Sequence, residues 1–134
     1  MSYLPSLREN AVLLDVFRAY PATSVPLVEY HEALMRGASP FSIAERELVA
    51  GFVSRLNACQ YCAGVHVATT EKFGTSAGVV DHAVEDLETA PLAATMKPVL
   101  AYVRTLTESP RRVTVGDAAS VLAAGWPEQA LHDA

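Results

Sequence analysis

The chemistry that this sequence could perform centres on its two cysteines, Cys59 and Cys62. They stand three positions apart, and His66 follows four positions after the second cysteine. If the pair opens a helix, the unpaired N–H groups and the positive end of the helix dipole favour the thiolate, which is the nucleophilic form. The spacing also lets the two sulfurs form a disulfide. One sulfur can therefore attack an oxidant, and the other can resolve the product.

Two effects compete over which sulfur attacks first. The helix dipole favours Cys59, with a stabilisation of about 0.3–1 kcal/mol at an exposed site. His66 shares a helix face with Cys62, because residues four apart are neighbours on a helix, and its imidazole can take the proton of that thiol. A close imidazole outweighs the dipole. We therefore predict that Cys62 is the attacking thiolate and that Cys59 is the resolving thiol.

Glu47 is a further candidate for the site, because of the helix face on which it lies. That face also carries three small residues, Gly51, Ser54 and Ala58. A neighbouring side chain or backbone can approach such a face closely, whereas the main apolar face of the helix points elsewhere. The carboxylate of Glu47 could orient His66 or relay a proton. Glu45, by contrast, is explained by helix capping.

Each assignment has a simpler alternative, and spacing alone leaves these alternatives open. The cysteines could be two buried small hydrophobic residues or, with His66, part of a zinc site. His66 could be an ordinary core histidine, and Glu47 could be a surface charge. Tyr61, between the cysteines, could wall the substrate pocket or donate its hydroxyl, although packing would also explain it. No second C-x-x-C or H-x-x-x-H pattern completes a zinc site, so we expect neither a metal nor an organic cofactor.

Composition and charge place the chain among globular proteins and argue against several functions. The 134 residues are 51% hydrophobic and 19% charged, which fits one domain, residues 1–134, with its core motif at 42–74. The net charge is −5 and the basic residues are scattered, so we expect no nucleic-acid partner. No apolar run reaches the roughly 18 residues of a membrane span, so we expect no membrane insertion. The N-terminal residues do not resemble a secretory signal, and we expect a cytoplasmic, reducing location.

The hydrophobic pattern predicts an all-α fold, a single-domain bundle of about seven helices. Strand-like alternation is not sustained anywhere. Ser42 and Glu45 match a capping box, Cys59 or Gln60 begins the helix of the cysteine pair, and Thr114 caps a later helix. Ser24 is expected to cap an earlier helix. A helix expected over about 91–106 contains Pro98, which predicts a kink or a break.

Residues 42–50, followed by 57–66, resemble the alkylhydroperoxidase D-like branch of the carboxymuconolactone decarboxylase family. The match is composite: Glu47, eleven residues, Cys59-x-x-Cys62, three residues and His66. Flanking residues resemble the peroxidase-related subgroup, and the likeness extends from about residue 25 to the end of the sequence. The family's best-known peroxidase has a second histidine where this chain has Tyr61. Tyrosine is a poor proton shuttle at neutral pH, so we expect slow peroxidase turnover or a different substrate.

The resemblance implies an all-helical fold that works as a homo-oligomer, a dimer, trimer or hexamer. A mean hydropathy of +0.20 also favours subunits that share a core. The resemblance also implies a small hydroperoxide as substrate and an external dithiol or disulfide reductant as partner. Cys62 would take the peroxide oxygen, Cys59 would close the disulfide, and Glu47 with His66 would relay the proton. Two alternatives are the decarboxylation that names the family, in which relatives do not depend on a cysteine pair, and a zinc-binding or redox-sensing helical module.

Overall fold

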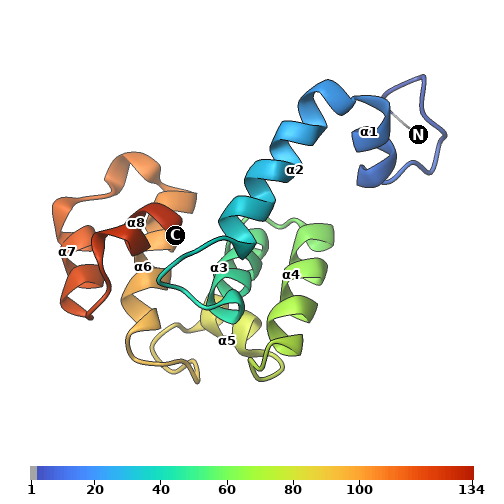
Figure 1. The fold of residues 1–134 in the computed structure, drawn as a ribbon. Coiled ribbons are helices and arrows are strands. Elements are labelled where there is room, and N and C mark those ends of the chain that lie inside the picture. The colour runs from blue at the N-terminus through green and yellow to red at the C-terminus, as the bar shows by residue number, and fades with distance from the viewer. Residues whose placement is uncertain (1–2) are drawn as a thin grey trace. The chain divides into compact units, whose positions relative to one another are not determined.

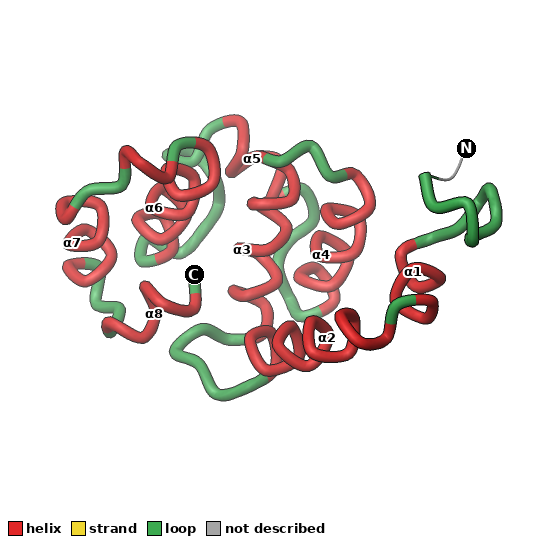
Figure 2. Tube along the Cα trace, turned by 90° about the horizontal axis from the view of Figure 1, so that it is seen from above, coloured by secondary structure: helices red, strands yellow, loops and turns green. Residues whose placement is uncertain are grey.

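The computed structural model describes residues 3–134, and every regular element in that range is a helix (Figures 1 and 2). The all-α prediction is confirmed, with eight α-helices and one short 3₁₀-helix in place of about seven helices. The elements are α1 (Leu13–Ala19), α2 (Pro21–Arg36), α3 (Ile43–Leu56), α4 (Gln60–Lys72), α5 (Val79–Glu85), α6 (Met96–Glu108), η1 (Pro110–Arg112), α7 (Val115–Ala123) and α8 (Glu128–Asp133).

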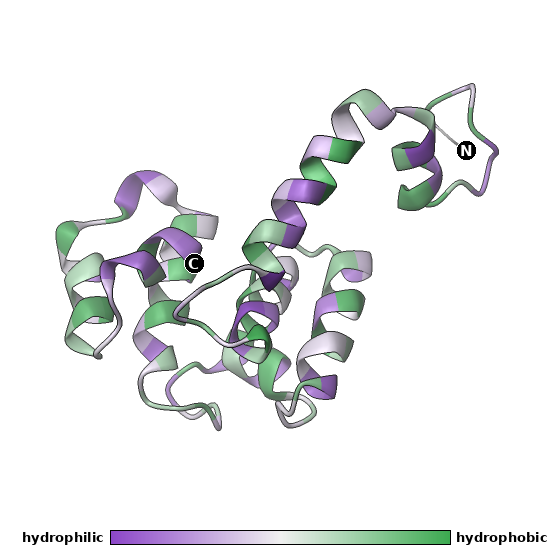
Figure 3. Ribbon diagram, in the orientation of Figure 1, coloured by the Kyte–Doolittle hydropathy of each residue, from purple (hydrophilic) through white to green (hydrophobic). Residues whose placement is uncertain are grey.

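The chain divides into two compact units, and the boundary along the sequence lies between Gly37 and Ala38. The first unit contains α1 and α2, which pack against each other. It leaves many apolar side chains about half exposed, and Figure 3 shows the hydrophobic colour on both helices. The most exposed of these side chains on α2 is Tyr30, at 64%. All the predicted site residues lie in the second unit.

The second unit is built around α3. Helices α4, α5 and α6 each pack against α3, and α7 packs against α6 (Figures 1 and 2). Phe52 of α3 is fully buried, and its ring lies 5.2 Å from the guanidinium carbon of Arg104 on α6. The same guanidinium donates hydrogen bonds to the carbonyls of Ala83 and Val84 at the end of α5. Apolar side chains from these helices, together with Phe41 just before α3, form one core: Phe41, Leu48, Val49, Phe52, Val79, Val80, Met96, Val99, Leu100, Val103 and Val121.

Two of the predicted helix caps are confirmed, and two expectations about proline-containing helices are wrong. Ser42 and Glu45 form the capping box of α3. Helix α2 begins at Pro21, before Ser24, because proline at the first helical position needs no N–H partner and has a helical φ. Helix α6 begins at Met96, which puts Pro98 in its first turn, where N–H groups have no intrahelical acceptor. The helix therefore continues through Pro98 without a break.

Thr114 caps α7, and its partner Asp117 makes this cap sensitive to pH. The hydroxyl and the backbone N–H of Thr114 each donate to Asp117 Oδ2 at 2.7 Å. These hydrogen bonds hold the pKa of the Asp117 carboxyl below its ordinary value. A lowered pKa means that the ionised carboxylate stabilises the folded state above the ordinary pKa, and that this contribution is lost as the pH falls through the folded value.

We predict that Asp117→Asn lowers the free energy of unfolding at neutral pH by an amount that shrinks in acid. The difference between wild type and D117N should be constant above about pH 5 and should narrow below about pH 4, where the wild-type carboxyl becomes protonated. Urea unfolding at a series of pH values measures it. A difference that does not change with pH would show that the charge of Asp117 contributes nothing to the cap.

Within residues 3–134, none of the helices combines the length and the apolar character that crossing a bilayer requires.

Candidate active site

The turn between α3 and α4 places the cysteine pair at the start of a helix. After α3 ends at Leu56, the N–H of Ala58 donates to the carbonyl of Arg55 at 3.0 Å, and the N–H of Cys59 donates to that of Ser54 at 2.9 Å. These two bonds form a Schellman motif, which satisfies the last carbonyls of α3. Ala58 has a φ of +54°, the left-handed conformation that the motif needs. Cys59 consequently becomes the N-cap of α4, as the sequence predicted.

The two cysteines lie close enough to be bonded. Cys59 and Cys62 form a disulfide, with their Cα atoms 5.4 Å apart, and both residues are half-buried. The N–H of Cys62 donates to Cys59 Sγ at 3.3 Å, so the sulfur of Cys59 occupies the capping position. In the reduced protein this N–H and the helix dipole stabilise a thiolate at Cys59. The geometry therefore allows the pair to alternate between a dithiol and a short disulfide ring.

Glu47 reaches across from α3 to the histidine of α4. Its Oε2 lies 2.7 Å from Nδ1 of His66. Glu47 is only 2% exposed, and the His66 side chain is 18% exposed. Glu47 is thus not the surface charge of the simpler alternative. A carboxylate that accepts a hydrogen bond from Nδ1–H fixes the neutral imidazole in the tautomer whose Nε2 can accept a proton.

The small-residue face of α3 packs against α4 and α5. A methyl group added to Gly51 would lie 3.5 Å from Cγ2 atoms of Val67 on α4 and Val80 on α5. Gly51, Glu47 and Ser54 are all buried. The expected close approach on this face is confirmed at Gly51. Ala58 was wrongly placed on the same face, because α3 ends at Leu56 and Ala58 lies exposed in the turn that follows. The approach brings the face of α4 that carries His66 to the carboxylate of Glu47.

Two residues shape the site in ways that the sequence does not reveal, the left-handed conformation of Ala58 and the burial of Thr70. Ala58 gives no signal, because left-handed positions are normally recognised by glycine or asparagine. Thr70 is completely buried and joins α4 to α3 through its hydroxyl. Its one available signal is its position, one helical turn beyond His66. Threonine is common on exposed helix faces, so this spacing alone does not predict burial.

Tyr61 lies in the first turn of α4 and is 60% exposed. Packing in the core therefore does not explain this tyrosine. Its place next to both cysteines keeps it a candidate for the wall of a substrate pocket.

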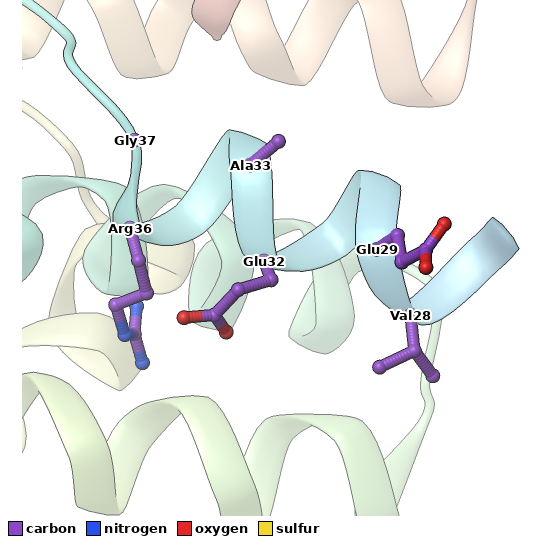
Figure 4. A pocket seen from close by; sticks show the side chains of 6 residues that line it. All are labelled: Val28, Glu29, Glu32, Ala33, Arg36 and Gly37. Carbon is purple, nitrogen blue, oxygen red and sulfur yellow. The ribbon is translucent and has the colours of Figure 1, made fainter. Parts of the chain in front are cut away.

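The described residues offer no alternative site of comparable chemistry. Between residues 3 and 134, no three His, Cys, Asp or Glu side chains are grouped so as to hold a metal ion. A hollow of about 620 Å³ follows the C-terminal half of α2, where Glu32 and Arg36 project to the same side of the helix (Figure 4). None of the five predicted site residues lines it.

The left-handed Ala58 yields a stability prediction. An alanine in this conformation costs about 1–2 kcal/mol, because its Cβ crowds the following carbonyl. We predict that Ala58→Gly raises the free energy of unfolding by about 1 kcal/mol. Gly74, with a φ of +105° after α4, provides the matched control, and Gly74→Ala should destabilise by a similar amount or more. Urea unfolding of the oxidised protein measures both. A destabilised A58G would mean that the methyl group of Ala58 makes contacts worth more than the strain.

Comparison with known families identifies the larger part of the chain. The model of the carboxymuconolactone decarboxylase family matches residues 21–104, which include Glu47, both cysteines and His66. No curated protein matches the sequence significantly.

Two solved structures are similar in fold. One is described as an alkylhydroperoxidase AhpD core, an uncharacterized peroxidase-related protein from Ralstonia eutropha JMP134, with a TM-score of 0.81 and 20% sequence identity. The match covers 88% of this chain and 62% of that one. The other is an uncharacterized peroxidase-related protein from Silicibacter sp. TM1040, with a TM-score of 0.79 and 25% identity over 88% of this chain and 63% of that one. The chain thus spans less than two thirds of either protein.

Proposed function

The chain belongs to the carboxymuconolactone decarboxylase family, and we propose that it is a thiol-dependent peroxidase that reduces hydrogen peroxide or small organic hydroperoxides. One observation carries this proposal. A bonded cysteine pair opens α4, and one turn after Cys62 the same helix presents a histidine held by a buried carboxylate. This combination supplies a nucleophile, a resolving thiol and an oriented base. The similarity to peroxidase-related proteins adds support at the level of the fold.

The proposed cycle balances with a hydroperoxide and an external dithiol. His66, oriented by Glu47, takes the proton of the Cys62 thiol, and the thiolate attacks the terminal oxygen of the peroxide. The O–O bond breaks, Cys62 becomes a sulfenic acid, and the alcohol or water leaves with the proton. The Cys59 thiol then displaces hydroxide from that sulfur, which forms the disulfide and releases water. An external dithiol reduces the disulfide by exchange and is itself oxidised.

A thiol count before and after oxidation tests the proposal. The protein is reduced, freed of reductant without oxygen, and titrated for thiols. It is then given one equivalent of hydrogen peroxide or of a small alkyl hydroperoxide. We expect two thiols per chain to disappear together within minutes. Two thiols that persist for many minutes with both oxidants would overturn the proposal.

Tyr61 belongs to the proposed site as part of the substrate pocket. It stands between the two cysteines in the sequence, directly before Cys62, and is 60% exposed, so it is available to a small substrate that approaches this end of α4. A tyrosine there supplies an apolar wall with a polar tip rather than a second proton shuttle.

The need for an external dithiol also fits a reducing compartment such as the cytoplasm.

We further infer that the chain forms a homo-oligomer, a dimer, trimer or hexamer. The support comes from the first unit, where Leu14 on α1 and Val25 and Leu27 on α2 are each more than half exposed. Apolar side chains that a chain leaves more than half exposed are typical of surfaces covered by another subunit. Light scattering at a series of low concentrations should give a mass above that of one chain. A stable monomer would contradict the inference.

A further inference from the structure

Thr70 is a polar residue in the interior of the second unit that the proposed reaction does not use. It lies on α4 and is 0% exposed. Its Oγ1 donates a hydrogen bond to the carbonyl oxygen of Ala44 on α3, at 2.9 Å. The same Oγ1 lies 2.8 Å from Oγ1 of Thr75, just after α4. A hydroxyl has one proton, so Thr70 donates to Ala44 and accepts from Thr75.

The C-terminal end of α4 is capped by backbone hydrogen bonds, one of which is accepted by Thr70. The N–H of Gly74 donates to the carbonyl of Glu71 at 3.0 Å, and that of Thr75 donates to the carbonyl of Thr70 at 3.1 Å. This is a second Schellman motif, with Gly74 in the left-handed position. Thr70 and Thr75 are therefore joined both through the backbone and through their hydroxyls. The hydroxyl of Thr70 fastens this capped end of α4 to the first turn of α3.

Polar links connect α3 and α4 at several points, one of them between Arg55 and Gln60 at the cysteine end of α4. Three other links follow one antiparallel register. Thr70 bonds to Ala44, His66 bonds to Glu47, and Cys59 bonds to Ser54. From one of these links to the next, the residue number on α3 rises, and the residue number on the α4 side falls by the same or nearly the same amount. The apolar contacts between them, such as Gly51 against Val67, are non-directional and tolerate sliding or rotation. Hydrogen bonds depend steeply on distance and angle, so they determine the register.

We propose that Thr70 is a positioning residue, whose hydroxyl holds α4 in the register that keeps His66 Nδ1 on the carboxylate of Glu47. The Cys59–Ser54 bond holds one end of α4, Thr70 holds the other, and His66 lies between them. Without the hydroxyl, the far end of α4 loses its hydrogen bond to α3, and the Ala44 carbonyl and the Thr75 hydroxyl, both partly buried, each lose one partner. The consequence for peroxide reduction rests on the proposed function; the consequence for the imidazole does not.

Three variants test this assignment. Thr70→Val removes the hydroxyl at nearly constant volume, and Thr70→Ser keeps it. Thr69→Val is the matched control, because the Thr69 hydroxyl donates to the carbonyl of Val65 in its own helix. The first measurement is the tautomer of the His66 ring by ¹H–¹⁵N NMR, in protein without peroxide, at a pH above the ordinary titration range of histidine. The second is the rate of thiol loss with hydrogen peroxide.

We expect wild type, T70S and T69V to show the Nδ1–H tautomer and the same rate of thiol loss. T70V should show a mixture with the Nε2–H tautomer, which imidazole prefers in water, and a rate lower by at least about tenfold, within the contribution of a positioned base. A T70V protein with the wild-type tautomer would overturn the assignment, as would a T69V protein whose tautomer changes as much as that of T70V.

If T70V does not fold, Thr75→Val should change the tautomer in the same direction, because the Thr75 hydroxyl polarises and orients that of Thr70. Wild-type behaviour of T75V would then contradict the proposal.

The two measurements separate this inference from the peroxidase proposal. If wild type does not react with peroxide but the tautomer changes in T70V alone, the peroxidase proposal fails and the positioning role stands. If wild type reacts and T70V matches it in both measurements, the positioning role fails and the peroxidase proposal stands.

Discussion

Cys62→Ser should abolish the reaction of the protein with peroxide, whereas Cys59→Ser should react once and stop at a sulfenic acid. This is the expected result if Cys62 attacks and Cys59 resolves. A serine hydroxyl is not ionised at neutral pH and does not attack peroxide, so C62S should keep the single thiol of Cys59 after peroxide is added. C59S lacks the thiol that would condense with the sulfenic acid, so the oxidised sulfur persists.

Mass spectrometry and a sulfenic-acid trapping reagent distinguish these states. C59S should gain one oxygen per chain and react with the reagent, while C62S should gain none. The double variant serves as the blank, and dilute protein prevents disulfides between chains. The opposite assignment, with Cys59 as the attacking sulfur, also has a physical basis. Cys59 Sγ accepts the N–H of Cys62 and is the sulfur that the helix dipole favours. If C62S forms the trapped sulfenic acid and C59S does not, the two roles are reversed.

The second large effect is expected at Glu47. Glu47→Gln keeps the size of the side chain but removes the charge that accompanies His66 Nδ1–H. The amide cannot stabilise the imidazolium that forms when His66 takes the proton, and it presents a donor as readily as an acceptor. We expect the rate of thiol loss with peroxide to fall about 10²-fold or more, the contribution of a positioned acid–base group. Stopped-flow measurement of disulfide formation gives this rate.

Glu45→Gln is the matched control for Glu47, since it changes the same residue type in the same helix. Glu45 Oε2 accepts hydrogen bonds from the N–H and the hydroxyl of Ser42, both at 2.8 Å, in the capping box of α3. E45Q should lower stability by about 0.5–1 kcal/mol and leave the rate unchanged. Equal rate losses in E45Q and E47Q would mean that the effect comes from a weakened α3 and not from the carboxylate at His66.

The features that could be predicted from the sequence are those that depend on neighbours in the chain. Ser42 and Thr114 were recognised as caps because the capping box is a contact between residues three apart. The start of α4 at the cysteine pair was found for the same reason. Pro98 was misjudged because its effect depends on where the helix begins, and helix starts are uncertain by several residues.

The contact between Glu47 and His66 needed more than local information. The sequence indicated which neighbours share a helix face with each residue. The two faces meet, however, only if the turn after α3 directs α4 back along α3 at the correct angle. That angle is set at Ala58, whose left-handed conformation has no signature in an alanine. The link from Thr70 to Ala44 spans 26 residues, and no periodic pattern predicts which hydroxyl reaches which carbonyl. For Glu47 and His66, the resemblance to a known family supplied the pairing that local rules could not.

The compactness of the α3–α4 hairpin has a consequence for folding. Every group in the proposed chemistry, together with Thr70, lies within one pair of adjacent helices joined by a three-residue connection. Contacts between segments so close in sequence have low contact order, and closing such a short loop costs little entropy. We therefore expect this hairpin to form early on the folding pathway, before α6 is recruited from farther along the chain to complete the core around Phe52.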